Sequence, residues 1–289
     1  MLVRAATRGS PLARWQAEHV AWLLRAVDPS LRVELVVVDT DGDRRLDVPI
    51  WELGGKGVFA KEVQSAVLDD RADIAVHSAK DLPSVTGPGL VLAAVPERGD
   101  PRDALVGSTL ADLPEAAEVA TGSLRRQAQL AAVRPDLRFV GLRGNMATRL
   151  AKAADHAAVV VAATALDRLG LADQIAERLP TDVVLPQVGQ AALAIECRED
   201  DEGLRALLRA IEAPGARRCV DAERAFLAAL GGDCSLPAAA YATLADDVLS
   251  IEGRIASVDG STVLRHVGAD GGDVARHLLE HGGSDLLGR

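Results

Sequence analysis

The sequence predicts an α/β fold that ends in a small α+β unit, and three observations support this prediction. Strand-like segments alternate with helical ones from the N-terminus to about residue 96, which predicts a parallel α/β layer. The alternation restarts after Pro96–Pro101, a segment typical of a domain crossing. After Pro214 one helix is followed by three segments of period-2 hydrophobicity, the pattern of an antiparallel sheet.

The first stretch of the chain contains three expected strands, at Leu2–Thr7, Leu31–Asp39 and Ala72–Val76. A helix follows the first strand, because Ser10 can cap it and Pro11 suits its first turn. A second helix follows the chain break at Gly54–Gly57 and carries an apolar face. This stretch is therefore expected to form one α/β domain.

The second stretch repeats the pattern, with strands expected at Glu118–Ala120, Leu137–Leu142 and Ala157–Ala163. A second crossing is expected near Pro186–Gln190. Beyond it we expect a helix at Arg217–Leu230, a hairpin turn at Asp259 and Gly260, and a last helix at Asp273–His281. The predicted domains are residues 1–96 with 190–214, residues 102–186, and residues 217–289.

Composition and charge narrow the functional classes. Hydrophobic residues make up 48% of the 289 residues but aromatic ones only 2%, so the core depends on Ala, Val and Leu. A net charge of −10 argues against a general nucleic-acid binder. No apolar run reaches the ~18 residues of a spanning helix, and the first residues lack a signal-peptide layout. Three cysteines without CxxC spacing disfavour a disulfide framework or a zinc site and suit a reducing cytoplasm.

Arginines recur just after the predicted strands, at Arg8, Arg125, Arg126, Arg143 and Arg168. Arg149 lies one or two turns into a following helix. In open α/β sheets ligands bind at this edge, and arginine is suited to bidentate carboxylate or phosphate contacts. The set predicts a cationic cleft for a polyanionic small molecule, whereas any one of these arginines could equally form a surface salt bridge.

Other motifs are weaker on their own. Gly54–Gly57 resembles a phosphate loop but does not fit the GxxxxGK pattern. Ser78 and Lys80 have the residue types of a nucleophilic pair, and Asp81 could be only a turn residue before Leu82. The HxxEH motif at His277–His281 lies at the chain end without an evident third ligand, so we expect no metal site there.

The cysteines fall in different contexts. Cys234 follows Gly231–Asp233 in a loop between a predicted helix and a predicted strand, so both a buried structural thiol and an attachment site stay open. Cys197 lies in an apolar segment and is expected in the core.

Taken in order, these segments closely resemble the porphobilinogen deaminase family over almost the whole chain. The similar segments are ATRGSPLA from Ala6, the loop at Gly54–Phe59, ADIAVHSAKDLP from Ala72, TGSLRRQ from Thr121, LRGNMATRL from Leu142, Arg168–Gly170, Leu185–Arg198 and the loop at Cys234. The resemblance implies three domains, the first two like type II periplasmic binding proteins with mixed sheets and the third with a three-stranded antiparallel sheet.

The resemblance also implies an activity, that of hydroxymethylbilane synthase. Such an enzyme joins four porphobilinogens head to tail, releases ammonia each time and hydrolyses off the linear tetrapyrrole. Its dipyrromethane cofactor would be bound to Cys234 by a thioether and would serve as primer. Each pyrrole brings an acetate and a propionate, so the cationic cleft predicted above suits the growing chain.

Roles for individual residues follow from the same resemblance. Asp81 would be the catalytic carboxylate that contacts pyrrole N–H groups and stabilises the azafulvenium cation. The cofactor would be held by Lys80, Asp81, Ser123, Arg125, Arg126, Arg143 and Phe59. The substrate would be bound by Arg8, Ser10, Arg149, Arg168, Lys56 and Gln190.

The chain departs from the family pattern at three positions. Asp233 stands before Cys234, where a nearby carboxylate disfavours the thiolate. Ala191 ends the usual VGQG segment and could stiffen a hinge, and Ala79 is expected to be harmless. A non-catalytic anion-binding module or an inactive relative is the alternative. We expect a cytoplasmic monomer with no nucleic-acid or membrane partner; a transient hand-over of product to uroporphyrinogen-III synthase stays open.

Overall fold

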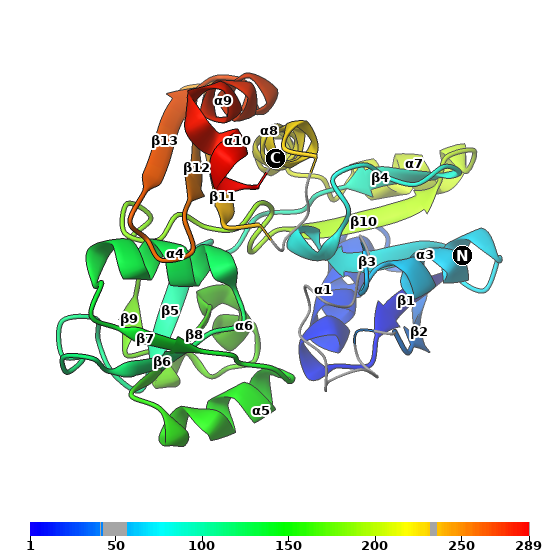
Figure 1. Cartoon of the computed structure of the whole chain (residues 1–289). Helices are drawn as coiled ribbons and strands as arrows, with labels where there is room; N and C mark the ends of the chain where they lie inside the picture. The colour runs from blue at the N-terminus through cyan, green and yellow to red at the C-terminus, as the bar shows by residue number, and fades with distance from the viewer. Residues whose placement is uncertain (41, 43–56, 232–235, 289) are drawn as a thin grey trace.

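The computed structural model describes residues 1–40, 42, 57–231 and 236–288. In these ranges the chain forms two five-stranded sheets and one three-stranded sheet, each with its own helices (Figure 1). The predicted fold class, two mixed α/β layers followed by a small α+β unit, is confirmed.

The first sheet has the strand order β2-β1-β3-β10-β4. Its strands are β1 Leu2–Arg8, β2 Arg32–Val38, β3 Ile74–Ser78, β4 Leu90–Ala94 and β10 Leu193–Arg198. β1 runs parallel to β2 and β3, whereas β10 runs antiparallel to β3 and β4. Its helices are α1 Pro11–Val27, α3 Lys61–Leu68, α7 Glu202–Arg209 and the short 3-10 turn η2 Ala79–Asp81.

Alternation along β1 explains how the helices cover this sheet. Val3 and Ala5 belong to a core cluster with Val20 of α1, whereas Ala6 packs with Val63 of α3. Because successive strand residues point to opposite faces, α1 and α3 lie on opposite sides of the sheet.

The second sheet has the order β7-β6-β8-β5-β9, with β6 parallel to β7 and β8 and β5 antiparallel to β8 and β9. Its strands are β5 Asp103–Val106, β6 Glu118–Ala120, β7 Arg138–Val140, β8 Ala158–Ala162 and β9 Glu177–Arg178. Its helices and 3-10 turns are α4 Leu124–Val133, α5 Met146–Ala151, η3 Lys152–Asp155, α6 Ala163–Arg168 and η4 Ala172–Gln174. Strand β7 is shorter than the predicted Leu137–Leu142.

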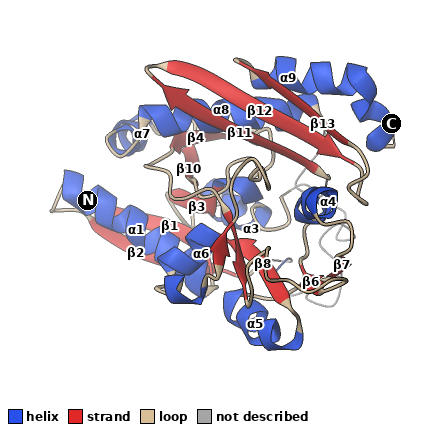
Figure 2. Cartoon of the chain, turned by 90° about the vertical axis from the view of Figure 1, so that its left-hand side faces the viewer, coloured by secondary structure: helices blue, strands red, loops and turns tan. Residues whose placement is uncertain are grey.

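The third sheet and its helices form what we call the C-terminal unit (Figure 2). Its elements are α8 Pro214–Ala229, β11 Ala238–Ala245, β12 Val248–Ala256, β13 Val263–Gly268, α9 Gly271–Leu278, the π turn η5 Leu279–Gly283 and α10 Ser284–Leu286. The sheet packs on α8 and α9 around the buried Phe226 and Val274. The helix predicted at Asp273–His281 is present as α9, and the backbone leaves the helical conformation at His281 and Gly282, with φ of +104° at Gly282.

The two crossings and the C-terminal unit meet at a buried ion pair. Arg98 of the first crossing lies 2.6 Å from Glu223 of α8. The Glu223 carboxylate also accepts hydrogen bonds from Gly189 N of the second crossing, at 2.7 Å, and from Ala242 N of β11, at 2.9 Å. Burial opposes the charge on Arg98, but Glu223 outweighs this effect and raises the Arg98 pKa. One carboxylate therefore ties three separate segments together.

Candidate active site

Asp81 lies at the carboxyl edge of the first sheet, where η2 follows β3 directly. Arg8 ends the neighbouring parallel strand β1, so the sheet brings both residues to one edge. The Arg8 Nη1 lies 3.8 Å from the Asp81 Oδ2. The Arg8 guanidinium also lies over the Phe59 ring, 4.2 Å from its centroid. Three predicted site residues are thus in contact.

Lys80 precedes Asp81 in the same turn and is half-buried. Its Nζ donates a hydrogen bond to Gln190 Oε1 at 3.2 Å. Burial and the nearby positive charge of Arg126 lower the pKa of Lys80 to about 8. An anion beside Lys80 would raise this pKa again and favour the charged form, which is the behaviour expected of a carboxylate-binding lysine.

Arg149 reaches the same region from α5, in the second sheet's layer. Asn145 caps this helix by accepting a hydrogen bond from Thr148 N at 3.0 Å, and Arg149 Nε donates to Gly144 O at 2.8 Å. Burial lowers the pKa of Arg149 to about 10, and neighbouring arginines add to the effect. These neighbours are Arg126, Arg143 and Arg8, and the carboxylate of Asp81 opposes them.

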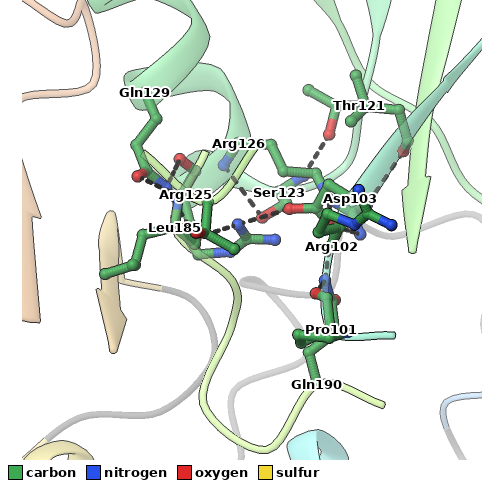
Figure 3. Close-up of polar contacts among 12 residues, drawn as sticks. Pro101, Arg102, Asp103, Thr121, Ser123, Arg125, Arg126, Gln129, Leu185 and Gln190 are labelled. Atoms are coloured by element: carbon green, nitrogen blue, oxygen red, sulfur yellow. Dashed lines mark hydrogen bonds and ion pairs between the residues drawn. The ribbon is translucent and has the colours of Figure 1, made fainter. Parts of the chain in front are cut away.

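Arg125 and Arg126, in the first turn of α4, both point to Asp103 of β5 (Figure 3). Arg125 Nη1 lies 2.7 Å from Asp103 Oδ2, and Arg126 Nη2 lies 2.7 Å from Oδ1. Burial alone would raise the pKa of Asp103, but the two arginines outweigh it and hold this pKa well below its usual range. The arginines also donate to backbone carbonyls, Arg125 to Leu185 O and Arg126 to Val160 O.

Sequence reasoning missed Asp103. The available signal was a carboxylate at the head of an otherwise apolar strand, since Ala104, Leu105 and Val106 are all buried with it. A buried carboxylate requires cationic partners, and two arginines at one helix start are natural candidates.

Gln190 lies between the two sheets' layers and is fully buried. Its Nε2 donates to Pro101 O and to Asp103 Oδ1, both at 2.8 Å (Figure 3). Its Oε1 accepts from Lys80. The amide is thus engaged by the protein on both sides. Its predicted contact with substrate stays a prediction, and the geometry makes Gln190 a support for Lys80.

Two serines cap the helices beside the cluster. Ser10 Oγ accepts from Ala13 N at 3.2 Å at the start of α1, which confirms its predicted capping role. Ser123 Oγ accepts from Arg126 N at 3.4 Å at the start of α4. A serine hydroxyl that accepts from a backbone amide still has its own hydrogen to donate, so both remain suited to carboxylate contact.

Arg168, at the end of α6, connects the second layer to the first. Its Nη2 donates to Ala191 O at 2.7 Å, and its guanidinium lies over the Trp15 ring of α1, 5.4 Å from the centroid. Burial lowers the Arg168 pKa to about 10. Ala191 itself adopts φ of +70°, a conformation that a side chain disfavours.

Several predicted site residues fall elsewhere. Cys234 and Lys56 lie outside the described residues, as do Gly54, Gly55 and Asp233. Cys197 is fully buried in the first core cluster, as predicted, and burial raises the pKa of its thiol to about 11. Such a thiol is a poor nucleophile at neutral pH.

The C-terminal histidines are stacked face to face. The His277 ring lies 3.7 Å from His266 and 4.0 Å from His281, between ring centroids. Within the described ranges, no group of three or more His, Cys, Asp or Glu side chains is placed to hold a metal ion. No helix in those same ranges is long and apolar enough to cross a membrane.

We define the cationic cluster as Arg8, Lys80, Arg126, Arg143 and Arg149. It gathers side chains from both α/β layers around Asp81, and the lowered pKa values of Lys80 and Arg149 reflect charges held close together with reduced hydration. Asp103 is already paired with Arg125 and Arg126. Cationic groups therefore outnumber carboxylates in this set, and the arrangement suits a ligand with several carboxylates.

Comparisons with known proteins identify the family to which the sequence is similar. Two family models match the chain: "Porphobilinogen deaminase, dipyromethane cofactor binding domain" over residues 3–206 and "Porphobilinogen deaminase, C-terminal domain" over residues 217–278. A porphobilinogen deaminase of Syntrophotalea carbinolica is 46% identical over 298 aligned positions, covering 99% of this chain and 95% of that protein. One from Syntrophomonas wolfei is 45% identical over 300 positions, covering 99% and 97%.

Among solved structures, the periplasmic aliphatic sulphonate binding protein SsuA of Escherichia coli is similar at a TM-score of 0.41 and 17% identity, covering 80% of this chain and 70% of that one. The family models cover more than half of the chain, and the relatives align along nearly all of it. The chain therefore belongs to the porphobilinogen deaminase family.

Proposed function

We propose that this chain is a hydroxymethylbilane synthase, a transferase that joins four porphobilinogens head to tail with loss of ammonia and then releases the linear tetrapyrrole by hydrolysis. The observation that carries the proposal is the cationic cluster around Asp81, drawn from both α/β layers. Each porphobilinogen brings an acetate and a propionate, so the substrate chain supplies carboxylates that suit a cluster of this charge.

The same residues fit an anionic cofactor. The lowered pKa values of Lys80 and Arg149 mean that the protein alone leaves these cations poorly neutralised. We place a dipyrromethane on Cys234, outside the described residues, with its carboxylates held by Lys80, Ser123, Arg125, Arg126 and Arg143 and its rings near Phe59 and Asp81. When bound, this group supplies the pyrrole carbon to which the first substrate is joined.

The chain's own residues have three separate roles in this reaction. Asp81 faces the pyrrole N–H groups of the substrate and stabilises the positive charge that develops as ammonia leaves. Arg8, Ser10, Arg149 and Arg168 bind substrate carboxylates, together with Lys56 outside the described residues. Gln190 acts by holding Lys80 in place, because its amide bonds Lys80 on one side and Asp103 on the other.

We also propose the domain limits expected from the sequence: residues 1–96 with 190–214, 102–186 and 217–289. The protein would act as a cytoplasmic monomer, in keeping with the unpaired, buried thiols of Cys197 and Cys219. Its partner would be the small-molecule substrate, without nucleic acid or membrane, with a transient hand-over of product to uroporphyrinogen-III synthase.

Two measurements on the purified protein test this proposal. Incubation with porphobilinogen should release ammonia and form a linear tetrapyrrole, and the intact mass should exceed the sequence mass by two linked pyrrole units. Cys234→Ser should lose this excess and the activity. Cys197→Ser and Cys219→Ser are matched controls and should keep the excess, since both thiols are buried in the core. An active wild type without the added mass would contradict the cofactor assignment, and carboxylate binding without ammonia release would indicate a binding module instead.

A further inference from the structure

The C-terminal unit touches helix α4 through the turn between β12 and β13 (Figure 1 and Figure 2). Gly260 in this turn adopts φ of +73°. A Cβ at this position would overlap the backbone nitrogen of Ala132 and lie 2.6 Å from the carbonyl carbon of Ala131. The turn therefore rests directly on the backbone of α4, with no room for a side chain between them.

A second contact joins the same two elements. Arg254 of β12 is 6% exposed, and its Nη1 donates to Gln129 Oε1 of α4 at 3.1 Å. Its Nε donates to Glu252 at 2.7 Å. In the strand ladder Arg254 lies opposite Ala239, near the start of β11. Because β11 follows the segment that contains Cys234, Arg254 lies in the part of the sheet nearest in sequence to the proposed attachment site.

Gln129 links Arg254 to Arg125 of α4 through hydrogen bonds. Its Oε1 also accepts from Leu185 N at 2.8 Å, and its Nε2 donates to Leu185 O at 3.1 Å and to Arg125 O at 3.3 Å. Arg125 Nη1 donates to the same Leu185 carbonyl at 2.7 Å (Figure 3). Two hydrogen-bonded steps thus separate Arg254 from Arg125, and every side chain in them is buried.

We propose that Arg254 and Gln129 are positioning residues that keep the C-terminal unit in register with Arg125 and Arg126 while the product chain grows. The proposal rests on the proposed function. Each condensation adds two carboxylates, so the unit that bears the attachment point and the helix that bears the arginines have to keep one geometry. The charged hydrogen bond from Arg254 to the buried Gln129 amide, together with Gly260 packed on the α4 backbone, fixes the C-terminal unit against α4.

The test compares Arg254→Met, Gln129→Met and the double variant with wild type, each as holoprotein. The matched control is Arg265→Met. Arg265 lies opposite Arg254 in the ladder and donates to the same Glu252 at 2.8 Å, but its side chain is 59% exposed. We expect both single variants to load cofactor and to turn over about tenfold more slowly, the size expected for one lost charge-assisted bond. With limiting porphobilinogen they should accumulate partly elongated chains by intact mass, and Arg265→Met should not.

Two further readouts separate positioning from general stability. The double variant should be no slower than the slower single one, and Arg254→Met should speed amide exchange at Leu185, whose N–H is bonded to Gln129. Arg254→Lys keeps the positive charge and an N–H donor group. It should therefore recover part of the lost turnover and part of the lost protection at Leu185, and it replaces the Met variant if that variant does not fold. Additive rate losses, or elongation and exchange patterns like those of wild type, would overturn the proposal. An inactive wild type would instead refute the proposed function, and the exchange measurement would still decide the coupling.

Discussion

Arg8 and Asp81 face each other across 3.8 Å, at neighbouring positions on the carboxyl edge of one sheet. This distance is too long for a hydrogen bond, so the pair is electrostatic and Arg8 does not occupy the carboxylate oxygens with a direct hydrogen bond. The arginine is itself held in place by the Phe59 ring. A carboxylate held beside an arginine without a direct hydrogen bond to it suits a substrate with pyrrole N–H groups.

Replacing Asp81 by Asn should reduce turnover by about 10²-fold or more, the loss typical of one electrostatic stabiliser. The reason is that the carboxylate interacts more strongly with the charge of the transition state than with the neutral ground state. Steady-state rates, with circular dichroism and cofactor content on the same sample, measure this. Asp81→Glu should retain a remnant of activity because the charge survives. Near-wild-type rates for Asp81→Asn would mean that Asp81 is only a turn residue before Leu82.

The arginines should separate into two groups when each is changed to Met. Arg125→Met and Arg126→Met each remove a partner of the buried Asp103, so we expect a loss of stability on the order of 3 kcal/mol and much apoprotein. Arg149→Met removes a cation that is costly to bury, so the fold should persist while elongation stalls. Unfolding curves and native gels of the bound intermediates distinguish the groups. Arg143→Met is expected to resemble Arg149→Met, and normal turnover in all four variants would contradict the cationic-cluster interpretation.

Lys80 should make carboxylate binding depend on pH near 8. Its pKa is lowered from 10.5 to about 8 in the folded protein, so between these values the unfolded state binds the additional proton. The contribution of Lys80 to stability therefore increases as pH rises from about 8 to 10.5. A bound carboxylate reverses the preference, so affinity should fall as pH rises through 8, with proton uptake on binding.

Calorimetry in two buffers of different ionisation enthalpy measures that proton uptake. A pyrrole dicarboxylate without the aminomethyl group is a suitable ligand, because it adds no titrating amine of its own. Lys80→Arg should move the loss of affinity to higher pH, since guanidinium stays charged. An unchanged pH dependence in Lys80→Arg would assign the titration to another group.

Ala191 should be a strained position in the second crossing. A non-glycine residue at φ of +70° costs roughly 1 kcal/mol, so Ala191→Gly should relieve strain and raise the free energy of unfolding by up to about that amount, less the added freedom of the unfolded chain. Gly189→Ala is the contrasting variant, because a Cβ there would lie 2.9 Å from the carbonyl carbon of Ala79. It should destabilise strongly in denaturant titrations. Equal effects of the two substitutions would show that backbone strain is not what distinguishes these sites.

Local patterns predicted much of this molecule. The cap at Ser10, the strand at Leu2–Thr7 and the hairpin at Gly260 are all properties of short segments, and the structure has each of them. The arginine set was visible because parallel strands end at one edge. These features depend on neighbours within about ten residues, which a sequence displays directly.

The polar junctions were not predictable in the same way. Asp103 meets Arg126 across 23 positions, and Glu223 meets Arg98 across 125. Gln129 has the residue type of an ordinary exposed helix position, yet it is buried between two units of the fold. Such pairings depend on how whole layers dock, and no short-range period records that.

The strand order of the first sheet has a consequence for how the chain acquires its structure. Strand β10 lies between β3 and β4, but it is made almost one hundred positions after β4. During synthesis β4 therefore waits without its neighbour until the whole second layer has emerged, and a fragment ending before residue 193 leaves an open edge on β3. The nascent protein is most exposed to aggregation in that interval, and the two α/β layers reach completion in reverse order of their appearance.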